Sequence, residues 1–487
     1  MKQVSVKKNY IYNTFYQILT LVTPLITAPY ISRIFGAEGV GIQSYTNSIA
    51  MYFTMFAALG TASYGQREIA QHRNDKREYS KIFWEIQLLC IITTLVCTAI
   101  WIVFSFISEA YTPYYLVLTM TIIAVAFDVS WFFAGQEQFK FIVIRNTIIK
   151  ILGIVLLFTC IKDSNDLLLY MALVAGTGLL GNVSMWSYLP KFLVKIDVCS
   201  LNIKRHIKET LVYFIPTIAT SVYTILDKTM IGLFTTGSAE NGYYEQTTKV
   251  VKMAQAVILS INTVMASRMS YLFSENRIGE VKEKIRKAMS FILLLGIPSV
   301  LGLIGIAENF VPWFFGDGYD PVIPLIYVYS PLIVIIGISN CLGSQYLTPS
   351  GQRARSSKGI IAGACVNAVL NLLLIPHLGA MGAAIGSVIA ETVITVIYLY
   401  MSKEFMTFGI IIQESYKRLI AGGVMLAVIW GVGGVCGQGI VTTLIQILVG
   451  GGSYFVLLIL LRDEFVKQYV LVKIQEIAKM ILHNRGR

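Results

Sequence analysis

The sequence predicts an all-α membrane protein with about 14 transmembrane helices. Of its 487 residues, 55% are hydrophobic and only 14% are charged, whereas a soluble domain carries about 25% charged residues. Apolar runs of about 20 residues, each long enough to cross a bilayer, recur from one end of the chain to the other. These runs do not alternate apolar and polar residues, so a closed β-barrel is excluded.

The apolar runs place the expected helices in order along the chain. They lie at about residues 10–31, 40–64, 82–107, 114–134, 141–161, 167–189, 211–234, 243–267, 288–311, 322–346, 358–376, 380–401, 418–437 and 441–461. The first run follows Lys2, Lys7 and Lys8 and is full length, unlike the short apolar region of a signal peptide. We therefore expect it to remain as the first helix.

Basic residues gather on one side of the predicted bundle. All but five of the 39 Lys and Arg residues fall at the N-terminus, at the C-terminus or in and beside every second loop. The five others are Arg33, Lys162, Lys228, Lys249 and Lys252. Since loops rich in Lys and Arg stay in the cytoplasm, this pattern predicts an even number of spans with both chain ends cytoplasmic. It also explains the net charge of +12 without a nucleic-acid partner.

A weak internal repeat predicts the domain organisation. The order Gly, Ala-Glu, Gly occurs at residues 36–41 and again at residues 237–242, an offset of about 200 residues or six predicted helices. Chance similarity of two glycine-rich turns is the alternative. Paired six-helix halves are a transporter design. We therefore expect six-helix lobes at 1–200 and 201–403, an extra helix pair at 404–462 and a basic, amphipathic cytoplasmic tail at 463–487.

Several charged residues lie within the predicted spans, with Asp128 expected inside the fourth helix. A charge at the centre of a span costs about 2.5–3.5 kcal/mol, so these side chains should face the bundle interior, a partner or water. They are Asp128, Arg145, Lys150, Asp227, Lys228, Glu245, Lys249, Lys252 and Glu391. One interpretation is buried structural pairs, such as Asp227 with Lys249. The other is an aqueous cavity with excess positive charge, which would attract a diphosphate.

Other patterns argue against several classes of site. The seven Cys and four His are scattered without metal-ligand spacing, so we expect no metal site. No Gly-Lys-Ser/Thr phosphate-binding loop is present, and the G-x-G-x-x-G match at residues 176–181 lies within a predicted membrane helix. There it favours helix packing over nucleotide binding. The short outer loops leave no room for an external catalytic domain, so we expect no enzyme activity and no catalytic residues.

Seven segments carry a resemblance to a known family. They are APYISRIFGAEGVG at 28–41, YGQREIA at 64–70, FDVSWFFAGQEQFKFIVIRNTIIKI at 127–151, LDKTMIG at 226–232, NGYYEQTTKVVK at 241–252, LGSQYLTPSG at 342–351 and NAVLNLLLIPHLGAMGAAIGSVIAE at 367–391. In this order the chain resembles the Wzx-type polysaccharide flippases. These belong to the multidrug/oligosaccharidyl-lipid/polysaccharide exporter superfamily, with the MATE exporters and the lipid II flippase MurJ. The extra helix pair departs from the twelve-helix pattern of many Wzx-type members.

The resemblance implies a fold, a substrate and a location. It implies two six-helix lobes around a central cavity that opens alternately to each side of a bacterial cytoplasmic membrane. The implied substrate is an undecaprenyl-diphosphate-linked oligosaccharide repeat unit of a capsule, O-antigen-like or other surface polysaccharide. Membrane lipids, a polysaccharide polymerase and chain-length proteins are implied partners. The substrate-binding candidates for a cationic cavity are Arg33, Arg145, Lys150, Lys228, Lys249 and Lys252.

The sequence leaves the driving force and two other functions open. We expect no cofactor, with coupling to a proton gradient, a sodium gradient or the membrane potential. The candidates for ion coupling or structural pairing are Asp128, Asp227, Glu245 and Glu391. A MATE-like ion-coupled exporter of small molecules is one alternative, although it would favour an acidic cavity. A membrane polymerase or glycosyltransferase is the other, although it would need a sizeable external loop.

Overall fold

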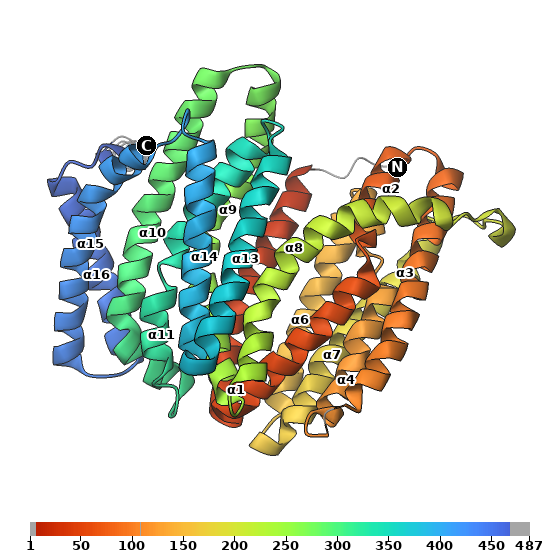
Figure 1. Cartoon of the computed structure of the whole chain (residues 1–487), viewed down its shortest axis with the longest axis horizontal. Helices are drawn as coiled ribbons and strands as arrows, with labels where there is room; N and C mark the ends of the chain where they lie inside the picture. The colour runs from red at the N-terminus through yellow and green to blue at the C-terminus, as the bar shows by residue number, and fades with distance from the viewer. Residues whose placement is uncertain (1–5, 108, 468–487) are drawn as a thin grey trace, which may run out of the picture. The chain divides into compact units, whose positions relative to one another are not determined.

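The computed structural model of the chain describes residues 6–107 and 109–467, and every regular element in them is helical. In the described part, ten helical segments are long and apolar enough to cross a membrane. The predicted all-α, multi-pass membrane architecture is therefore confirmed (Figure 1). The chain divides into two compact units, residues 1–245 and 246–487.

The first unit is a bundle of long helices. Its elements are α1 (Val6–Ala58), α2 (Thr61–Gln71), α3 (Lys76–Ser105), α4 (Thr112–Phe127), α5 (Ser130–Gly135), α6 (Phe139–Cys160), α7 (Leu167–Met185), α8 (Lys204–Phe234) and the start of α9 (Ala239–Ser274). Helix α4 packs between α3 and α7, and α6 packs on α7 (Figure 1). Helix α1 contacts α3, α4, α6 and α8, so it lies at the centre of the unit.

The first two predicted helices are joined into one. Helix α1 continues through the expected loop and is only kinked at Gly36, whose φ of 61° is a backbone conformation that glycine adopts at little cost. The second predicted helix is also shorter than expected, because α1 ends at Ala58 and not at residue 64. A separate helix, α2, fills residues 61–71, most of which were predicted to be a loop.

The two segments of the internal repeat lie against each other. A Cβ atom on Gly41 would lie 1.7 Å from the carbonyl oxygen of Ser238, and one on Gly242 would lie 2.0 Å from that of Ala37. Only residues without a side chain allow backbones to approach so closely. The sequence similarity between these segments is therefore matched by a reciprocal contact between the kink of α1 and the turn from α8 to α9.

The fourth predicted span is broken at Asp128, which corrects its expected place inside a helix. Helix α4 ends at Phe127, Asp128 is its C-terminal cap, and α5 begins at Ser130. The last four carbonyl groups of a helix lack partners within it. Here each of these four carbonyl oxygens accepts a hydrogen bond. Three donors are side chains from other segments: Asn182 Nδ2 donates to Ala124 at 2.8 Å, Gln87 Nε2 to Ala126 at 2.6 Å and Trp186 Nε1 to Phe127 at 2.9 Å. The fourth donor is the backbone N–H of Asp128, which donates to Val125 at 3.2 Å. These bonds stabilise a helix end inside the bundle.

The second unit contains the remaining helices. They are the rest of α9, then α10 (Ile278–Phe315), α11 (Val322–Tyr329), α12 (Leu332–Leu342), α13 (Arg353–Leu378), α14 (Ala380–Met401), α15 (Phe408–Cys436) and α16 (Ile440–Leu460). A π-helical turn at Gly343–Leu347 follows α12. Within α13, Asn371 Nδ2 donates to Asn367 Oδ1 at 3.1 Å.

The predicted extra helix pair is a packed part of this unit. Helices α15 and α16 contact each other and α10. Arg418 of α15 is 1% exposed, pairs with Asp463 at 3.2 Å and donates from Nη1 to the carbonyl oxygen of Ser290 on α10 at 3.0 Å. This buried bridge joins α15 to both α10 and the segment after α16. The predicted amphipathic tail lies outside the described residues from 468 onwards.

Candidate functional site

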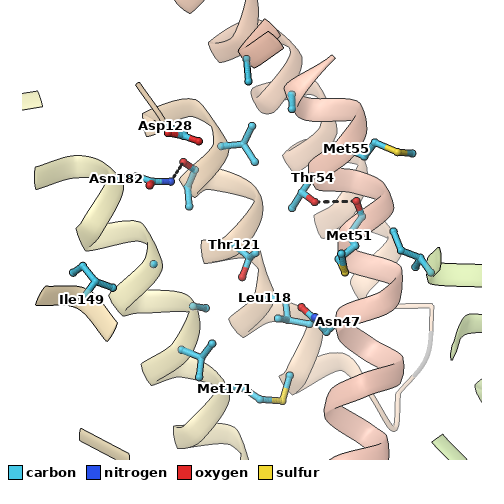
Figure 2. Close-up of a pocket in the computed structure, with 18 of the residues that line it drawn as sticks. Asn47, Met51, Thr54, Met55, Leu118, Thr121, Asp128, Ile149, Met171 and Asn182 are labelled. Carbon is cyan, nitrogen blue, oxygen red and sulfur yellow. Dashed lines mark hydrogen bonds between the residues drawn. The ribbon is translucent and has the colours of Figure 1, made fainter. Parts of the chain in front are cut away.

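A cavity of about 680 Å³ opens within the first unit. Its walls come from α1, α2, α4, α6, α7 and α8, and they include Met51, Met55, Leu118, Ile149 and Met171. Polar groups project from several of these helices: Gln43, Asn47, Thr121, Asp128, Arg145 and Asn182. Figure 2 shows Asp128 and Asn182 at one end of the cavity, with Asn47 and Met171 towards the other. The cavity is thus apolar in its walls and charged at one end.

Arg145 is the cationic group of this cavity. It projects from α6 and donates from Nη1 to Asn182 Oδ1 at 2.6 Å. Its Nε is buried without a hydrogen-bond partner, and no ion pair is found for Arg145 among the described residues. A partly buried guanidinium without an acidic partner is costly unless another acceptor binds it. Arg145 is therefore suited to bind an anion that enters the cavity.

Asp128 contributes a negative charge to the same cavity. Its Oδ1 accepts a hydrogen bond from the backbone N–H of Ser130 at 2.9 Å, across the break between α4 and α5. Within the described part of the chain, no ion pair within 4.0 Å joins it to Arg145. The cavity thus contains a cation and an anion that are held apart by different partners.

Lys150 belongs to a second cavity, of about 360 Å³, between α1, α6 and α7. Its ammonium nitrogen lies 5.6 Å from the centre of the Tyr16 ring, a cation–π contact. No carboxylate is among the lining residues. The two cavities share the wall residues Ile149, Val174 and Gly178. Arg145 and Lys150 are therefore placed in neighbouring compartments, and not in one.

Three other predicted charges lie together where α8 and α9 meet α1. Lys228 Nζ pairs with Glu245 Oε2 at 2.5 Å, and Ser44 Oγ donates to the same oxygen at 3.1 Å. Asp227 is buried and accepts a hydrogen bond from the hydroxyl of Tyr244. None of these residues lines the two cavities described above. The contact between Lys228 and Glu245 is therefore that expected of a structural ion pair.

The remaining candidates also lie outside the two cavities. Arg33 is exposed on α1. In the second unit, Lys249 is partly buried on α9, Lys252 is exposed on the same helix, and Glu391 is 9% exposed on α14. Because Asp227 and Lys249 belong to different units, their suggested pairing stays a prediction.

The structure also identifies a polar residue that the sequence interpretation missed. Asn182 contacts both Arg145 and the end of α4. It directly follows the glycine motif at 176–181, which predicts only helix packing. The signal for it was an amide side chain within a membrane-spanning run, where polar groups are expensive and tend to be functional.

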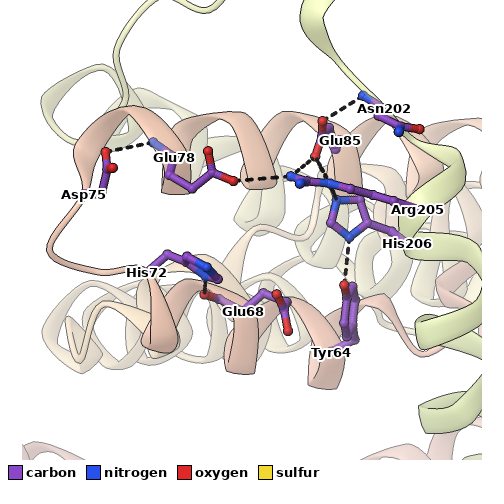
Figure 3. Close-up of polar contacts among 9 residues, drawn as sticks. All are labelled: Tyr64, Glu68, His72, Asp75, Glu78, Glu85, Asn202, Arg205 and His206. Atoms are coloured by element: carbon purple, nitrogen blue, oxygen red, sulfur yellow. Dashed lines mark hydrogen bonds and ion pairs between the residues drawn. The ribbon is translucent and has the colours of Figure 1, made fainter.

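A second missed feature is a cluster of buried charges around Glu85 of α3 (Figure 3). Glu85 is 0% exposed and accepts from the backbone N–H of Asn202 at 2.7 Å and from Arg205 Nε at 2.8 Å. His206 Nε2 lies 2.8 Å from Glu85, and His206 Nδ1 lies 2.8 Å from the hydroxyl of Tyr64. Burial lowers the pKa of His206, although the hydrogen bond that its ring donates to Glu85 opposes this. These contacts fasten the start of α8 to α2 and α3.

Comparison with known proteins places this architecture in a family. A model of the polysaccharide biosynthesis protein family matches residues 6–273, more than half of the chain. The chain belongs to the polysaccharide biosynthesis protein family. A model of the lipid II flippase MurJ matches residues 141–450. The predicted resemblance to the Wzx-type flippases and their superfamily is confirmed by these matches.

The individual proteins that are similar to this chain share little sequence identity with it. A putative O-antigen transporter of Escherichia coli (strain K12) is 23% identical over 82% of this chain and 96% of its own length. One from Shigella dysenteriae is 24% identical over 77% of this chain and 94% of its own. The inward closed conformation of the lipid II flippase MurJ is similar in fold, with a TM-score of 0.72, 18% identity and coverage of 93% of this chain and 99% of that one.

Proposed function

We propose that this protein is a flippase that moves oligosaccharide repeat units linked to undecaprenyl diphosphate across the bacterial cytoplasmic membrane. The observation that carries the proposal is the buried Nε of Arg145, which has no acceptor in a cavity within a bundle of membrane-spanning helices. A diphosphate supplies such an acceptor. The two relatives named as O-antigen transporters support a glycan substrate.

The geometry suggests which part of the substrate the cavity holds. Arg145 binds the diphosphate, and Lys150, in the neighbouring cavity, receives the same charge at another stage of the cycle. The apolar walls suit the lipid-proximal part of the substrate, whereas Asn47, Thr121 and Gln43 offer hydrogen bonds to sugar hydroxyls. Lys228, Lys249, Lys252 and Arg33 stay proposed contributors to the cationic path.

The arrangement in the membrane is part of the proposal. It has 14 spans, with residues 10–31 and 40–58 of α1 forming two of them on either side of the Gly36 kink, and both chain ends in the cytoplasm. Lobes at 1–200 and 201–403 rock to expose the substrate on each side in turn. The helix pair at 404–462 accompanies the second lobe, and residues 463–487 stay a proposed basic, amphipathic cytoplasmic tail. The protein acts as a transporter and not as an enzyme.

The driving force is proposed to be a proton gradient, a sodium gradient or the membrane potential. Moving one charge through 100 mV is worth about 2.3 kcal/mol, so an anionic substrate needs compensating positive charge. Asp128, Asp227, Glu245 and Glu391 are the carboxylates available to carry a proton or a sodium ion. A polysaccharide polymerase and chain-length proteins would receive the product.

The carboxylate of Asp128 in the cavity favours one alternative, a MATE-like exporter of small cations. The inward-facing structure of a MATE transporter is similar in fold, with a TM-score of 0.59 and 12% identity. Arg145 at the same end of the cavity opposes this alternative, because it would repel a cationic drug.

Depletion of the protein from its bacterial host tests the proposed function. A flippase predicts that lipid-linked oligosaccharide accumulates on the inner leaflet, out of reach of an impermeant reagent that modifies glycans, while surface polymer disappears. Re-expression of the wild-type chain should restore both. Oligosaccharide that reaches the outer leaflet unpolymerised would indicate a polymerase. Unchanged glycans together with increased sensitivity to cationic drugs would indicate the exporter.

A further inference from the structure

The charged end of the larger cavity contains two groups that attract each other and yet do not pair. Arg145 and Asp128 both line it, but no ion pair within 4.0 Å is found between them in the described part of the chain. Away from water, a guanidinium and a carboxylate attract strongly and tend to form two parallel hydrogen bonds. Something must therefore hold Arg145 away from Asp128.

Asn182 is the group that holds it. Asn182 Oδ1 accepts from Arg145 Nη1 at 2.6 Å, which ties the guanidinium to α7. The amide cannot simply turn over, because its Nδ2 donates to the carbonyl oxygen of Ala124 at 2.8 Å (Figure 2). That carbonyl is free to accept because α4 ends at Phe127. The break in α4 therefore sets the orientation of Asn182, and Asn182 sets that of Arg145.

Asp128 has its own restraint. The same break makes Asp128 the C-terminal cap of α4 and directs its Oδ1 to the backbone N–H of Ser130. With both groups restrained, Arg145 Nε is left buried without an acceptor. A guanidinium with an unmet donor is the group from which an anionic ligand gains most, since binding to it satisfies hydrogen-bonding capacity that is otherwise unused.

We propose that Asn182 is a positioning residue that prevents Arg145 from pairing with Asp128 and so keeps the guanidinium available to the diphosphate of the substrate. This inference rests on the proposed function. Without Asn182, Arg145 turns to Asp128 and the anion site closes by internal neutralisation. The break between α4 and α5 then has a purpose beyond bending the chain: it supplies the carbonyl that aims the amide.

A double-mutant cycle on the full-length protein in lipid nanodiscs tests this inference. The probe is radiolabelled undecaprenyl diphosphate, and undecaprenol, which lacks the phosphates, gives the background. We expect Asn182→Leu to weaken diphosphate-dependent binding about tenfold or more, the effect of losing a charge-assisted hydrogen bond. Adding Asp128→Asn should recover most of that loss, because Arg145 then has no carboxylate to pair with. Asp128→Asn alone should bind at least as tightly as the wild type.

A matched control removes another cap from the same helix end. Trp186 Nε1 donates to the carbonyl oxygen of Phe127, and Trp186 lines neither cavity. Trp186→Phe should therefore bind like the wild type. The inference is overturned if Trp186→Phe weakens binding as much as Asn182→Leu does, or if the double variant stays as weak as Asn182→Leu. It is also overturned if Asn182→Leu binds normally.

The same assay separates this inference from the proposed function. If the wild-type protein does not distinguish undecaprenyl diphosphate from undecaprenol, diphosphate recognition fails and the inference fails with it. If the wild type distinguishes them but Asn182→Leu does so equally well, only the positioning role fails. An excess of phosphatidylglycerol that displaces the probe completely would show a general phospholipid site, which contradicts both.

Discussion

Two regions of the first unit bury charge in opposite ways. Around Glu85, every charged partner is matched: the carboxylate is fully buried and accepts from Asn202 and Arg205, while His206 links it to Tyr64 (Figure 3). In the large cavity, Arg145 has a buried nitrogen without a partner, and Asp128, which Figure 2 shows beside Asn182, accepts from the backbone N–H of Ser130. The difference teaches that a buried charge indicates function only where its hydrogen bonds are incomplete.

The largest expected effect comes from breaking the matched cluster. Replacing Glu85 with alanine leaves Arg205 and His206 without their shared acceptor, and removing one partner of a buried pair costs about 3–5 kcal/mol of unfolding free energy. Denaturation of the purified protein in mixed micelles measures this. Glu283→Ala is the control, because Glu283 pairs with Lys287 on an exposed face, and it should leave the stability unchanged. Equal effects of the two variants would mean that the cluster does not hold the fold.

The next largest effect is expected from neutralising Lys150 in the second cavity. Lys150→Gln should lower transport of lipid-linked oligosaccharide about tenfold, as expected when one charged hydrogen-bond donor to the substrate is lost. Its stability should not fall, since the lining of its cavity provides no carboxylate partner to leave unpaired. The measurements are complementation of surface polymer and a melting curve of the same variant. A large loss of stability with normal transport would assign Lys150 to the structural group.

A smaller effect decides where Lys228 belongs. If Lys228 and Glu245 are a structural pair, each single substitution by glutamine destabilises the protein, and the double variant recovers about 0.5–3 kcal/mol of coupling energy. Transport by the double variant should then match the wild type. If Lys228 instead binds substrate, Glu245→Gln should increase binding of undecaprenyl diphosphate, and the double variant should not transport.

The smallest effect is a pH dependence of the matched cluster. Burial lowers the pKa of His206 in the folded protein, while an unfolded histidine has a pKa of about 6.5. Stability is therefore fully present above about pH 6.5 and decreases as the pH falls from there towards the lower folded pKa, because the unfolded chain takes up the proton first. His206→Gln should make the melting temperature depend less on pH between pH 7 and pH 5. An equally steep decrease in the variant would place the titrating group elsewhere.

The sequence predicted the membrane class and most helix positions, because each apolar run carries its own signal. It also placed Asp128, Arg145 and Lys150 within the membrane. It could not show which charges would be matched, because the partners come from distant segments. Arg205, for example, lies 120 residues after Glu85, and the latter was not counted among the charges within the spans.

The break at Asp128 shows the same limit. The run from residue 114 to residue 134 is apolar enough to be one helix, and the signal against it is a single carboxylate. The break is stable because Gln87, Asn182 and Trp186 supply donors from α3, from α7 and from the turn after α7. Local helix propensity cannot predict capping hydrogen bonds that come from residues in other parts of the chain.

The most direct test of the account is the sidedness of lipid-linked oligosaccharide in cells whose only copy of the protein carries Arg145→Gln. At wild-type levels of expression, the account predicts that the oligosaccharide stays on the inner leaflet, beyond the reach of an impermeant glycan-modifying reagent. Arg145→Lys, which keeps the charge but not the planar donors, should restore part of the exposure. Full exposure in the Arg145→Gln cells would contradict the claim that the incompletely bonded cation of the cavity is the group on which transport depends.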